Sequence, residues 1–436
     1  MNPKTAHIYF ITLISCINYI CNIFNDFEII ENRLIFKIYK RCQKQMKIKK
    51  VGILTGGGDA PGLNSVIYGI MLKAFESGID CIGILKGWEG FMNNLTITLN
   101  IAEHDDLHTV GGTLLYTSRT NPFKRAFKVE NKEKEEEIKK EIAQQMAKNY
   151  DELGIDALIA IGGDDTLGVA NTLYRYANAR VIGCPKTIDN DLAGTDYTFG
   201  FWSGTQLASN AMDNLTTTAR SHQRVFVVEI FGRDTGFLTL YSGLSAGADI
   251  ILIPEKPFDF EKDIVEILKK RIKAGYKYHI IACSEGAYPS NESLKNQIKT
   301  ISKETVDNLP KDPFGNPKLS HLNISEVLVE ELRERKDLKE AFLKEGIKLE
   351  IRSVILGHTM RAGPPNSFDR ILGLRFGLAA TKLVLDEDFG KMVSLKGKDI
   401  KSLPLSEGAK KAYVDEDKDL IELGDLLVKV RYLSKK

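Results

Sequence analysis

Two short polar loops contain the residues of this chain that are best suited to chemistry. The first loop is GGDDT at 162–166 and the second is PKTIDND at 185–191. Each loop follows an apolar run, at 157–161 and 181–184, with the length and composition of a buried strand. Because ligands bind outside the carboxyl ends of parallel strands, the two loops predict one shared site with four carboxylates and one ammonium group.

The residue types in these loops suit metal and phosphate chemistry. Asp164 would hold Mg²⁺, a hard cation that takes one or two carboxylates and keeps most of its waters. Lys186 can neutralise charge on a transferring phosphoryl group. Thr187, Asp189 and Asp191 are spaced at i, i+2 and i+4, so in an extended loop they face the same side. One carboxylate could then accept a hydroxyl proton while its neighbour orients it, which predicts phosphoryl transfer to a sugar-phosphate hydroxyl.

Further turns add phosphate-binding candidates. The strand pattern at 50–55 meets GGGDAPG at 56–62 and then a helical pattern at 63–76, which is the arrangement that cradles phosphate. A tight turn without a ligand is the alternative at Gly57, and a surface arginine is the alternative for Arg119. Any single aspartate of the two loops could also cap a helix or stabilise a turn. The full set, together with Gly57, Arg233 and Arg361, argues against that reading.

Composition limits the class of protein. Apolar residues make up 43% and charged residues 27% of the 436 residues, as in ordinary soluble globular proteins. The net charge is only +2; residues 1–50 carry +6 and the remainder about −4, so nucleic acid is not expected as a partner. The six cysteines show no metal-ligand spacing. Cys81, Cys184 and Cys283 fall in or beside apolar runs, which predicts reduced core residues of a cytoplasmic protein.

The first 45 residues are set apart from the rest. The apolar run at 8–24 resembles a signal-peptide core without a clean cleavage site, and it is too short and polar to predict a membrane span. Met46 precedes KIKKVGILTGGGD, a natural start for an α/β enzyme. We expect residues 1–45 to be absent from the working protein. A genuine signal or anchor, or a disordered or loosely docked extension, are the alternatives.

Strand patterns alternate with helical patterns along the chain. Such alternation predicts the α/β class, with parallel-rich sheets covered by helices on both faces. The length predicts two such sheets with a cleft between them. Residues 301–345 are polar and helix-rich, and we expect them to form a peripheral insertion. The predicted strands are 50–55, 81–85, 157–161, 181–184, 225–230, 249–253 and 279–283, and the predicted helices include 63–76, 132–150, 237–245, 262–274 and 369–385.

Taken in order, the motifs resemble those of the phosphofructokinase family. They are LTGGGDAPGLN, GGDDT, PKTIDND, SHQR, FGRDTG, SEG and LGHTMRAGPPNSFDR, and they run from Lys50 to about Leu385. The resemblance implies two Rossmann-like domains with the active-site cleft between them. It implies a phosphoryl-donor domain of residues 46–200 plus 359–410 and a fructose 6-phosphate domain of residues 201–358 plus 411–436, with the helical insertion at 301–345.

The resemblance also implies a role for each matching residue. Asp164 resembles the magnesium carboxylate, and Asp189 resembles the base that deprotonates the 1-hydroxyl of fructose 6-phosphate. Arg224 and Arg352 resemble arginines that reach into a neighbouring subunit's site, which implies a homodimer or homotetramer. Catalytic roles are expected for Asp189, Lys186, Asp165 and Arg233; donor contacts for Gly57, Arg119, Asp165 and Lys186; and sugar-phosphate contacts for Thr187, Ile188, Asp189, Arg224, Phe231, Gly232, Arg233, Glu285, Arg352, His358 and Arg361.

Two residues bear on the phosphoryl donor. Members of the family that use ATP usually have glycine where Asp165 stands. Two like charges ~4 Å apart repel by about 4 kcal/mol at an effective dielectric near 20, so Asp165 would oppose the α-phosphate of ATP. Lys186 replaces a small residue common in bacterial ATP-dependent members, although some ATP-using relatives carry it. The pair resembles the pyrophosphate-dependent branch, which transfers the phosphoryl group reversibly; an ATP-dependent 6-phosphofructokinase is the alternative.

Readings from other classes fit less well. A dinucleotide-binding regulatory domain would need a GxGxxG turn with an acidic residue about 20 positions further on, and GGGDAPG lacks that spacing. A secreted or membrane-anchored protein would require residues 1–45 to be genuine. The expected partners are therefore small molecules, fructose 6-phosphate and pyrophosphate, with no membrane.

Overall fold

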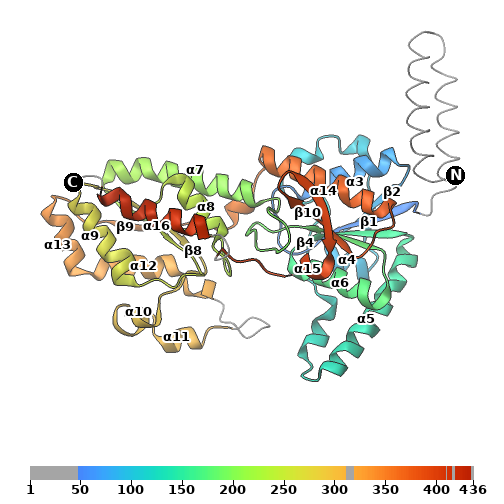
Figure 1. The fold of residues 1–436 in the computed structure, drawn as a ribbon, viewed down its shortest axis with the longest axis horizontal. Helices are drawn as coiled ribbons and strands as arrows, with labels where there is room; N and C mark the ends of the chain where they lie inside the picture. Colours follow the sequence, from blue (N-terminus) through green and yellow to red (C-terminus); the bar gives the residue numbers. More distant parts are fainter. Residues whose placement is uncertain (1–47, 311–318, 409, 415–417, 434–436) are drawn as a thin grey trace, which may run out of the picture.

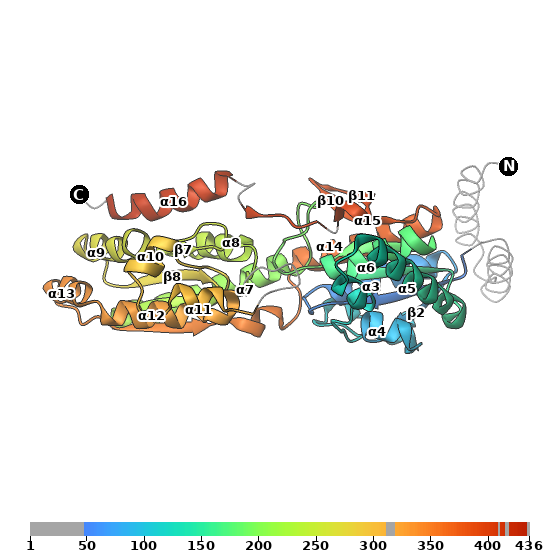
Figure 2. The same ribbon diagram turned by 90° about the horizontal axis from the view of Figure 1, so that it is seen from below.

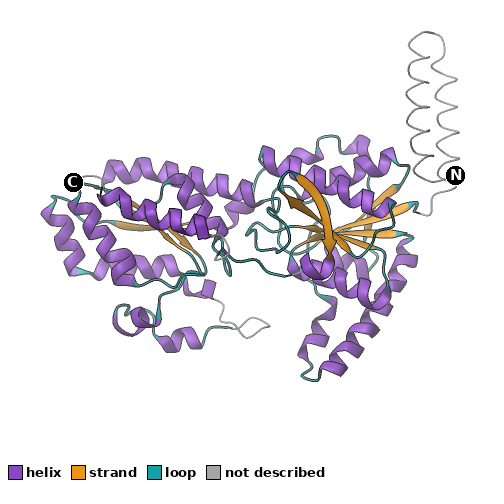
Figure 3. Ribbon diagram, viewed as in Figure 1, coloured by secondary structure: helices purple, strands orange, loops and turns teal. Residues whose placement is uncertain are grey.

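The computed structural model describes residues 48–310, 319–408, 410–414 and 418–433. Residues 1–45, for which we stated expectations above, lie outside the described part of the chain. Two lobes stand side by side, each with a sheet between layers of helices (Figures 1 and 3). The predicted α/β class, with parallel-rich sheets, is confirmed.

The first lobe contains a seven-stranded sheet in the order β11-β10-β5-β4-β1-β2-β3. The edge strands β3 and β11 pair antiparallel to their neighbours, and the other neighbours run parallel. Its strands are β1 (Lys50–Thr55), β2 (Asp80–Ile84), β3 (Thr96–Thr98), β4 (Ala157–Gly162), β5 (Val181–Pro185), β10 (Lys391–Lys396) and β11 (Asp399–Pro404), and its helices are α3 (Leu63–Glu76), α4 (Gly87–Met92), α5 (Lys132–Leu153), α6 (Asp164–Ala177), α14 (Ser367–Leu385) and α15 (Leu405–Gly408).

Both faces of this sheet are buried, which is why its central strands are apolar throughout. Successive side chains of a strand point to opposite faces. Ile159 and Ile161 of β4 accordingly pack in the core with α3 and α14, whereas Leu158 and Ala160 pack in the core with α5 and α6. The alternation fixes the orientation of the strand, and so the direction in which its terminal loop leaves the sheet.

The second lobe contains a four-stranded, fully parallel sheet in the order β7-β8-β6-β9. One core cluster joins one face of it to α7, α8 and α16, and another joins the other face to α9, α12 and α13. Its strands are β6 (Val225–Ile230), β7 (Ile250–Leu252), β8 (His279–Ser284) and β9 (Ile351–Ile355), and its helices are α7 (Phe201–His222), α8 (Phe237–Ala246), α9 (Glu266–Lys273), α10 (Asn291–Asn296), α11 (Lys303–Asp307), α12 (Ile324–Glu334), α13 (Lys336–Lys344) and α16 (Lys418–Leu433).

The chain passes between the lobes three times. It crosses before α7, again between β9 and α14, and a third time after α15 (Figures 1 and 2). The second crossing includes the short helix η6 (Gly357–Arg361). Residues from both lobes therefore alternate along the sequence, and the segments that cross lie beside the space between the lobes.

Most predicted elements lie where the patterns placed them, and β1 and β6 have the predicted bounds. The sequence patterns did not reveal α7 or β9. Polar residues interrupt the apolar pattern of α7, and several of them are buried. Ser209 is 7% exposed, and its hydroxyl donates to the carbonyl of Thr205, 2.8 Å away, one turn earlier. Such local bonds satisfy a small polar side chain inside a core, but they hide the helical period of the sequence.

The expectation that residues 301–345 form a peripheral insertion was wrong for α12 and α13. Leu328, Leu332, Leu338 and Phe342 are fully buried in the core of the second lobe. The abundant charged residues of this segment occupy the outer faces of two amphipathic helices, and they made the segment appear peripheral. Residues 311–318 lie outside the described part of the chain.

The described cysteines and helices bear on two further expectations. Cys81, Cys184 and Cys283 are buried and carry free thiols, as predicted for core residues. No helix in the described part of the chain is long and apolar enough to cross a membrane.

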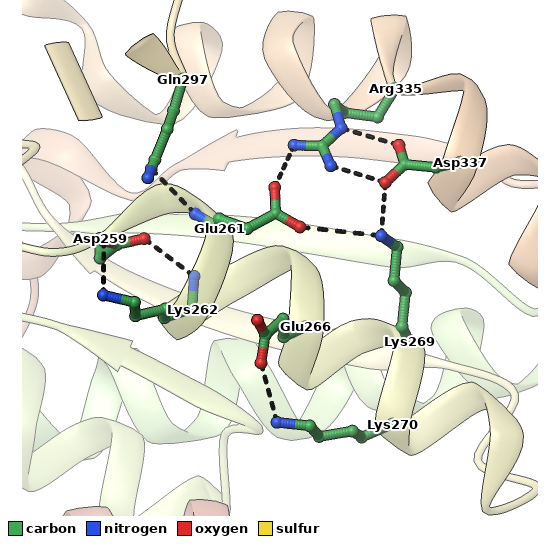
Figure 4. Close-up of polar contacts among 9 residues, drawn as sticks. All are labelled: Asp259, Glu261, Lys262, Glu266, Lys269, Lys270, Gln297, Arg335 and Asp337. Carbon is green, nitrogen blue, oxygen red and sulfur yellow. Dashed lines mark hydrogen bonds and ion pairs between the residues drawn. The ribbon is translucent and has the colours of Figure 1, made fainter. Parts of the chain in front are cut away.

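A charged network ties α13 to the helices beside it (Figure 4). Arg335 ends α12 and begins α13, and its guanidinium pairs with Glu261 at 2.6 Å. It also donates to both carboxylate oxygens of Asp337, at 2.8 and 2.6 Å. Lys269 of α9 pairs with the same two acids. The two cations lie between two carboxylates, so the network holds α9 against the junction of α12 and α13.

Replacing Arg335 should weaken this junction. We expect Arg335→Met to lower the free energy of unfolding by about 1 kcal/mol, because a partly exposed bidentate pair within a network is lost. Thermal denaturation should show a drop of about 2 °C at low salt and a smaller drop in 1 M NaCl, where the charges are screened. Lys339→Met, at an exposed position of α13, is the matched control. An equal drop in both variants would contradict the role given to the network.

Candidate active site

A cleft of about 390 Å³ lies where the lobes meet, and residues of both lobes line it. The polar loops that follow β4 and β5 form one wall. Residues after β6 and β8, together with η6, form the other. The predicted site residues that line the cleft are Gly57, Arg119, Asp164, Asp165, Lys186, Thr187, Ile188, Asp189, Phe231, Arg233, Glu285, His358 and Arg361.

The loop after β4 places two carboxylates at the start of a helix. Gly163 precedes α6, and Asp164 and Asp165 occupy its first turn. Acidic side chains are favourable there because the free backbone N–H groups give the helix start a partial positive charge. The side chain of Asp165 is exposed to the cleft. Burial of its surroundings and the neighbouring Asp164 raise the pKa of Asp165, while Lys411, Arg233 and Arg119 oppose that shift.

Gly57 and Lys186 lie close together beneath this wall. Gly57 has a φ of +82°, and a Cβ atom there would lie 3.4 Å from the Lys186 ammonium. The backbone N–H of Gly57 donates to Ser118 at 3.0 Å, and the Thr117 hydroxyl donates to the carbonyl of Gly57 at 2.6 Å. These bonds fix the glycine turn next to the loop that contains Arg119. The predicted donor residues therefore come from four separate loops but share one wall of the cleft.

Lys186 is a buried cation. Only 6% of the surface of Lys186 is exposed to solvent. Burial and the nearby Arg361 lower the pKa of Lys186 to about 8, while Asp191, Asp189 and Asp164 oppose the shift. The ammonium group is thus still largely charged at neutral pH. A buried charge of this kind is stabilised by surrounding carboxylates and would be stabilised further by a bound anion.

The PKTIDND loop differs from the extended conformation that its spacing suggested. The Thr187 hydroxyl donates to Asp191 at 2.7 Å and accepts from the backbone N–H of Asp189 at 3.1 Å. Asn190 has a φ of +54°, in the left-handed region. Its side chain accepts from the N–H of Thr198 at 2.9 Å, which holds the turn. The prediction of an extended loop was wrong, because local side-chain bonds stabilise a tight turn. Thr187, Asp189 and Asp191 nevertheless all line the cleft.

The carboxyl group of Asp189 has an unfavourable environment for its ionised form. Its Oδ1 atom is buried and has no hydrogen-bond partner within the described residues. Burial, together with Asp191 and Glu285, raises the pKa of Asp189 to about 7, while Arg361 and Arg233 oppose the shift. Asp189 nevertheless lines the cleft, so its carboxyl group lies where a ligand would bind. A carboxyl group with a pKa near neutrality is suited to act as a general base.

The opposite wall is cationic and aromatic. The Arg361 guanidinium lies over the Phe231 ring, 4.7 Å from its centroid, and His358 packs edge-on against the same ring at 5.7 Å. Arg233 donates to both carboxylate oxygens of Asp234, at 3.2 and 2.9 Å. Burial and Glu229 raise the pKa of Glu285. Two arginines, a histidine and a carboxyl group thus face Asp189 across the cleft.

Three of the predicted residues do not line the cleft. Gly232 lies behind it with a φ of +136°, and its carbonyl accepts from the Ser284 hydroxyl at 2.6 Å. Arg224 donates to Glu350 at 2.8 Å. Arg352 lies on β9 with an exposed side chain. Arg224 and Arg352 therefore cannot serve this chain's own cleft in the arrangement described.

Two charged residues near the cleft were missed from the sequence. Asp234 lines the cleft next to Arg233, and Lys411 forms an ion pair with Asp234. Asp234 could have been found, since it lies beside Arg233 in the FGRDTG motif. Lys411 lies in a polar segment with no motif, and only the tertiary fold brings it to the site. Trp88, Ser118, Thr120 and Asn121 also line the cleft.

The cleft fits a lightly coordinated divalent cation. Among the described residues, no group of three or more His, Cys, Asp or Glu side chains is arranged to enclose a metal ion. Asp164 can offer a carboxylate at the cleft surface, where water and phosphate oxygens would complete the coordination. Mg²⁺ is bound in this way in phosphoryl-transfer enzymes, by one or two carboxylates and by the oxygens of the substrate. The residues present therefore fit Mg²⁺ better than a metal that needs a protein cage.

Comparison with known sequences connects this site to named relatives. The chain is 42% identical over 359 residues to the pyrophosphate–fructose 6-phosphate 1-phosphotransferase of Amycolatopsis methanolica, covering 82% of this chain and 94% of the relative. It is 40% identical over 354 residues to ATP-dependent 6-phosphofructokinase 2 of Clostridium perfringens, covering 80% of this chain and 89% of the relative. High overall identity thus extends to relatives named for either donor.

Solved structures and the family pattern agree with these matches. A crystal structure of a pyrophosphate-dependent phosphofructokinase from Marinobacter aquaeolei shares the fold, with a TM-score of 0.63 at 20% identity, covering 87% of this chain and 92% of that chain. The pattern described as "Phosphofructokinase" matches residues 50–384. That range includes both walls of the cleft and all the predicted site residues. The chain belongs to the phosphofructokinase family.

Proposed function

We propose that the protein catalyses reversible, Mg²⁺-dependent transfer of a phosphoryl group from pyrophosphate to the 1-hydroxyl of fructose 6-phosphate. The products are fructose 1,6-bisphosphate and phosphate. The observation that carries the choice of donor is Asp165. Its carboxylate is exposed to the cleft in the first turn of α6, beside Asp164 and on the same wall as Gly57 and Lys186. A third phosphate group, as in ATP, would meet this charge, whereas pyrophosphate ends before it.

Asp189 supplies the base in this proposal. Its carboxylate, which lines the cleft, would accept the proton of the 1-hydroxyl as the oxygen attacks phosphorus, the P–O bond to the leaving phosphate breaks, and phosphate departs with the bond electrons. Thr187 fixes the position of Asp189 by accepting its backbone N–H. The microscopic reverse uses the protonated Asp189 as the acid, and a pKa of about 7 leaves both forms populated at neutral pH. Having both protonation states of Asp189 available suits a phosphoryl transfer that runs in both directions.

The cations neutralise the transferring group. Lys186 lies next to Gly57 and lines the cleft, and in this proposal its ammonium contacts the transferred phosphoryl group. Arg233 faces it from the other lobe. Fixed charges of this kind stabilise the spread negative charge of the transition state. Asp164 would hold Mg²⁺, which would offset part of the negative charge of pyrophosphate.

The sugar phosphate is assigned to the second wall. Arg361 and His358 are held by the Phe231 ring and present cationic and polar groups to the cleft. Arg224 and Arg352 lie outside it, which supports the expectation that they act on a neighbouring subunit's site. A homodimer, or a homotetramer built from such pairs, is therefore part of the proposal. The cytoplasm is its expected location, supported by the three buried free thiols.

An ATP-dependent 6-phosphofructokinase is the second candidate, and relatives so named at 36% to 40% identity favour it. The purified protein should be assayed with fructose 6-phosphate and Mg²⁺ and with either donor. We expect robust turnover with pyrophosphate, in both directions, and little with ATP. Turnover with ATP alone would reject the proposed donor but keep the family assignment.

Substituting Asp165 should change donor use. Asp165→Gly removes both the bulk and the charge that oppose the α-phosphate, so kcat/KM for ATP should rise about 10- to 100-fold. Asp165→Asn keeps the size but removes the charge, and the difference between the two variants separates steric from electrostatic exclusion. An unchanged ATP rate in both Asp165 variants would mean that Asp165 does not select the donor.

Lys186→Met should lower kcat/KM for pyrophosphate by about 10- to 100-fold, through loss of a charged hydrogen bond.

The rate should depend on pH through Asp189. Because only the ionised form can accept the hydroxyl proton, kcat/KM in the fructose 1,6-bisphosphate-forming direction should fall about tenfold per pH unit below about 7. It should level off above 7 and fall again above about 8, where Lys186 loses its charge. Asp189→Asn should lower kcat by about 10²- to 10⁴-fold. The residual rate of Asp189→Asn should no longer fall as the pH is lowered below 7. If the fall persists in this variant, another group is responsible for the titration.

The same substitution should stabilise the fold. The pKa of Asp189 is raised from 3.8 to about 7 in the folded chain. Between these pH values the carboxyl group ionises in the unfolded chain but stays protonated in the folded chain, so the free energy of unfolding falls as the pH rises. Asn carries no charge, so the advantage of Asp189→Asn should grow from about pH 4 to 7 and stay constant above pH 7. Thermal denaturation at pH 8 should show a gain on the order of 2 kcal/mol, that is, several degrees, and almost none near pH 4. A loss of stability at pH 8 would contradict the burial of an ionised carboxylate.

A further inference from the structure

Lys411 is fixed beside the active-site loops by its backbone. The segment 410–412 pairs antiparallel with the residues that directly follow PKTIDND. The N–H of Ala193 donates to the carbonyl of Lys410, and the N–H of Ala412 donates to the carbonyl of Asp191, both at 2.9 Å. Lys411 lies between these two bonds, opposite Leu192. Its Cα position is thereby set by the same loop that supplies the base.

The side chain of Lys411 reaches across to the other lobe. Its ammonium forms an ion pair with Asp234, whose carboxylate also accepts both N–H groups of Arg233. Lys411 and Asp234 are only partly exposed, at 28% and 31%. Asp234 is among the residues that line the cleft, whereas Lys411 is not, so the ammonium lies next to the cleft wall at Asp234. A lysine ammonium has three N–H donors, and the bond to Asp234 uses one of them.

The surroundings of Lys411 carry an excess of negative charge. Asp191 directly precedes Leu192, with which Lys411 pairs, and its carboxyl group lines the cleft together with Asp164 and Asp165. Asp234, the ion-pair partner of Lys411, is a further carboxylate of this cleft. Pyrophosphate would bring several more negative charges to this wall. A binding site for it needs cations in addition to Lys186 and Arg119, because pyrophosphate has no adenosine to contribute apolar contacts.

We propose that Lys411 is a pyrophosphate-binding residue, which donates from its free N–H groups to the phosphate that leaves, while Asp234 holds the ammonium at the edge of the cleft. The inference rests on the proposed function and extends it to a residue outside every recognised motif of the chain. It adds the third crossing between the lobes to the four loops that contain Gly57, Arg119, Asp165 and Lys186. This crossing joins the donor site to the wall that binds the sugar phosphate.

Steady-state kinetics of Lys411→Met test the proposal. Loss of a charged hydrogen bond should raise KM for pyrophosphate about tenfold and leave KM for fructose 6-phosphate within about twofold. Lys411→Arg keeps the charge and should restore most of the affinity for pyrophosphate. Lys410→Met removes the same charge from an exposed neighbouring position and is the matched control. Thermal denaturation of all three variants checks that the fold is retained.

Two kinetic outcomes would overturn the proposal. One is an unchanged KM for pyrophosphate in Lys411→Met. The other is an equal rise of both KM values, which would mean that Lys411 acts through Arg233 on the sugar-phosphate side.

Calorimetric titration with imidodiphosphate and Mg²⁺ separates this inference from the proposed function. It requires no turnover, and Lys411→Met should bind the analogue about tenfold more weakly than the unsubstituted protein. If the unsubstituted protein turns over only with ATP, the proposed donor fails. The titration still decides on Lys411, because equal affinity in the two proteins would reject its role.

Discussion

The active site depends on a carboxyl group that is kept out of water without a hydrogen-bond partner for one of its oxygens. Burial of Asp189 costs stability, because an ionised carboxylate loses hydration that no donor replaces within the described residues. The surrounding structure reduces this cost without removing it. Arg361 and Arg233 lie close enough to oppose the shift of its pKa, and Lys186 is held nearby by the same carboxylates. In the proposed mechanism this carboxylate is the base, so the stability that its burial costs is linked to its ability to accept a proton.

Charges of both signs are spread over two lobes, and this division has a physical reason. The loops after β4 and β5 carry the acids and Lys186, whereas the second lobe supplies arginines, a histidine and Glu285. If all these groups lay on one lobe, burying them would require a large, rigid polar core. Meeting across a cleft, they can be solvated before substrates bind and can lose water as substrates enter. Phosphoryl transfer benefits from that exclusion, because electrostatic stabilisation increases as water leaves.

Much of the site could be predicted because parallel sheets place strand ends along one edge. Asp164, Lys186 and Asp189 were identified from two apolar runs that each stop at a polar loop, and the structure brings them to one wall. The tight turn of PKTIDND could not be predicted, because it depends on the bonds of Thr187 and Asn190 rather than on spacing. The position of α12 was predicted wrongly because its sequence contains more charged residues, mostly on the outer face, than buried leucines. Lys411 was beyond the reach of any pattern, because its position depends on pairing with Leu192, more than two hundred residues earlier in the chain.

The interleaving of the two lobes has a consequence for synthesis on the ribosome. β5 pairs with β10, so Ile182 meets Lys391 only after most of the chain has been made. α14, which covers α3, is also made late. The first lobe therefore emerges early but lacks its last two strands and the helices α14 and α15 until residues 367–408 have been made. Its apolar edge and the exposed face of α3 must be protected meanwhile, whereas the four strands of the second sheet emerge without interruption and can assemble first.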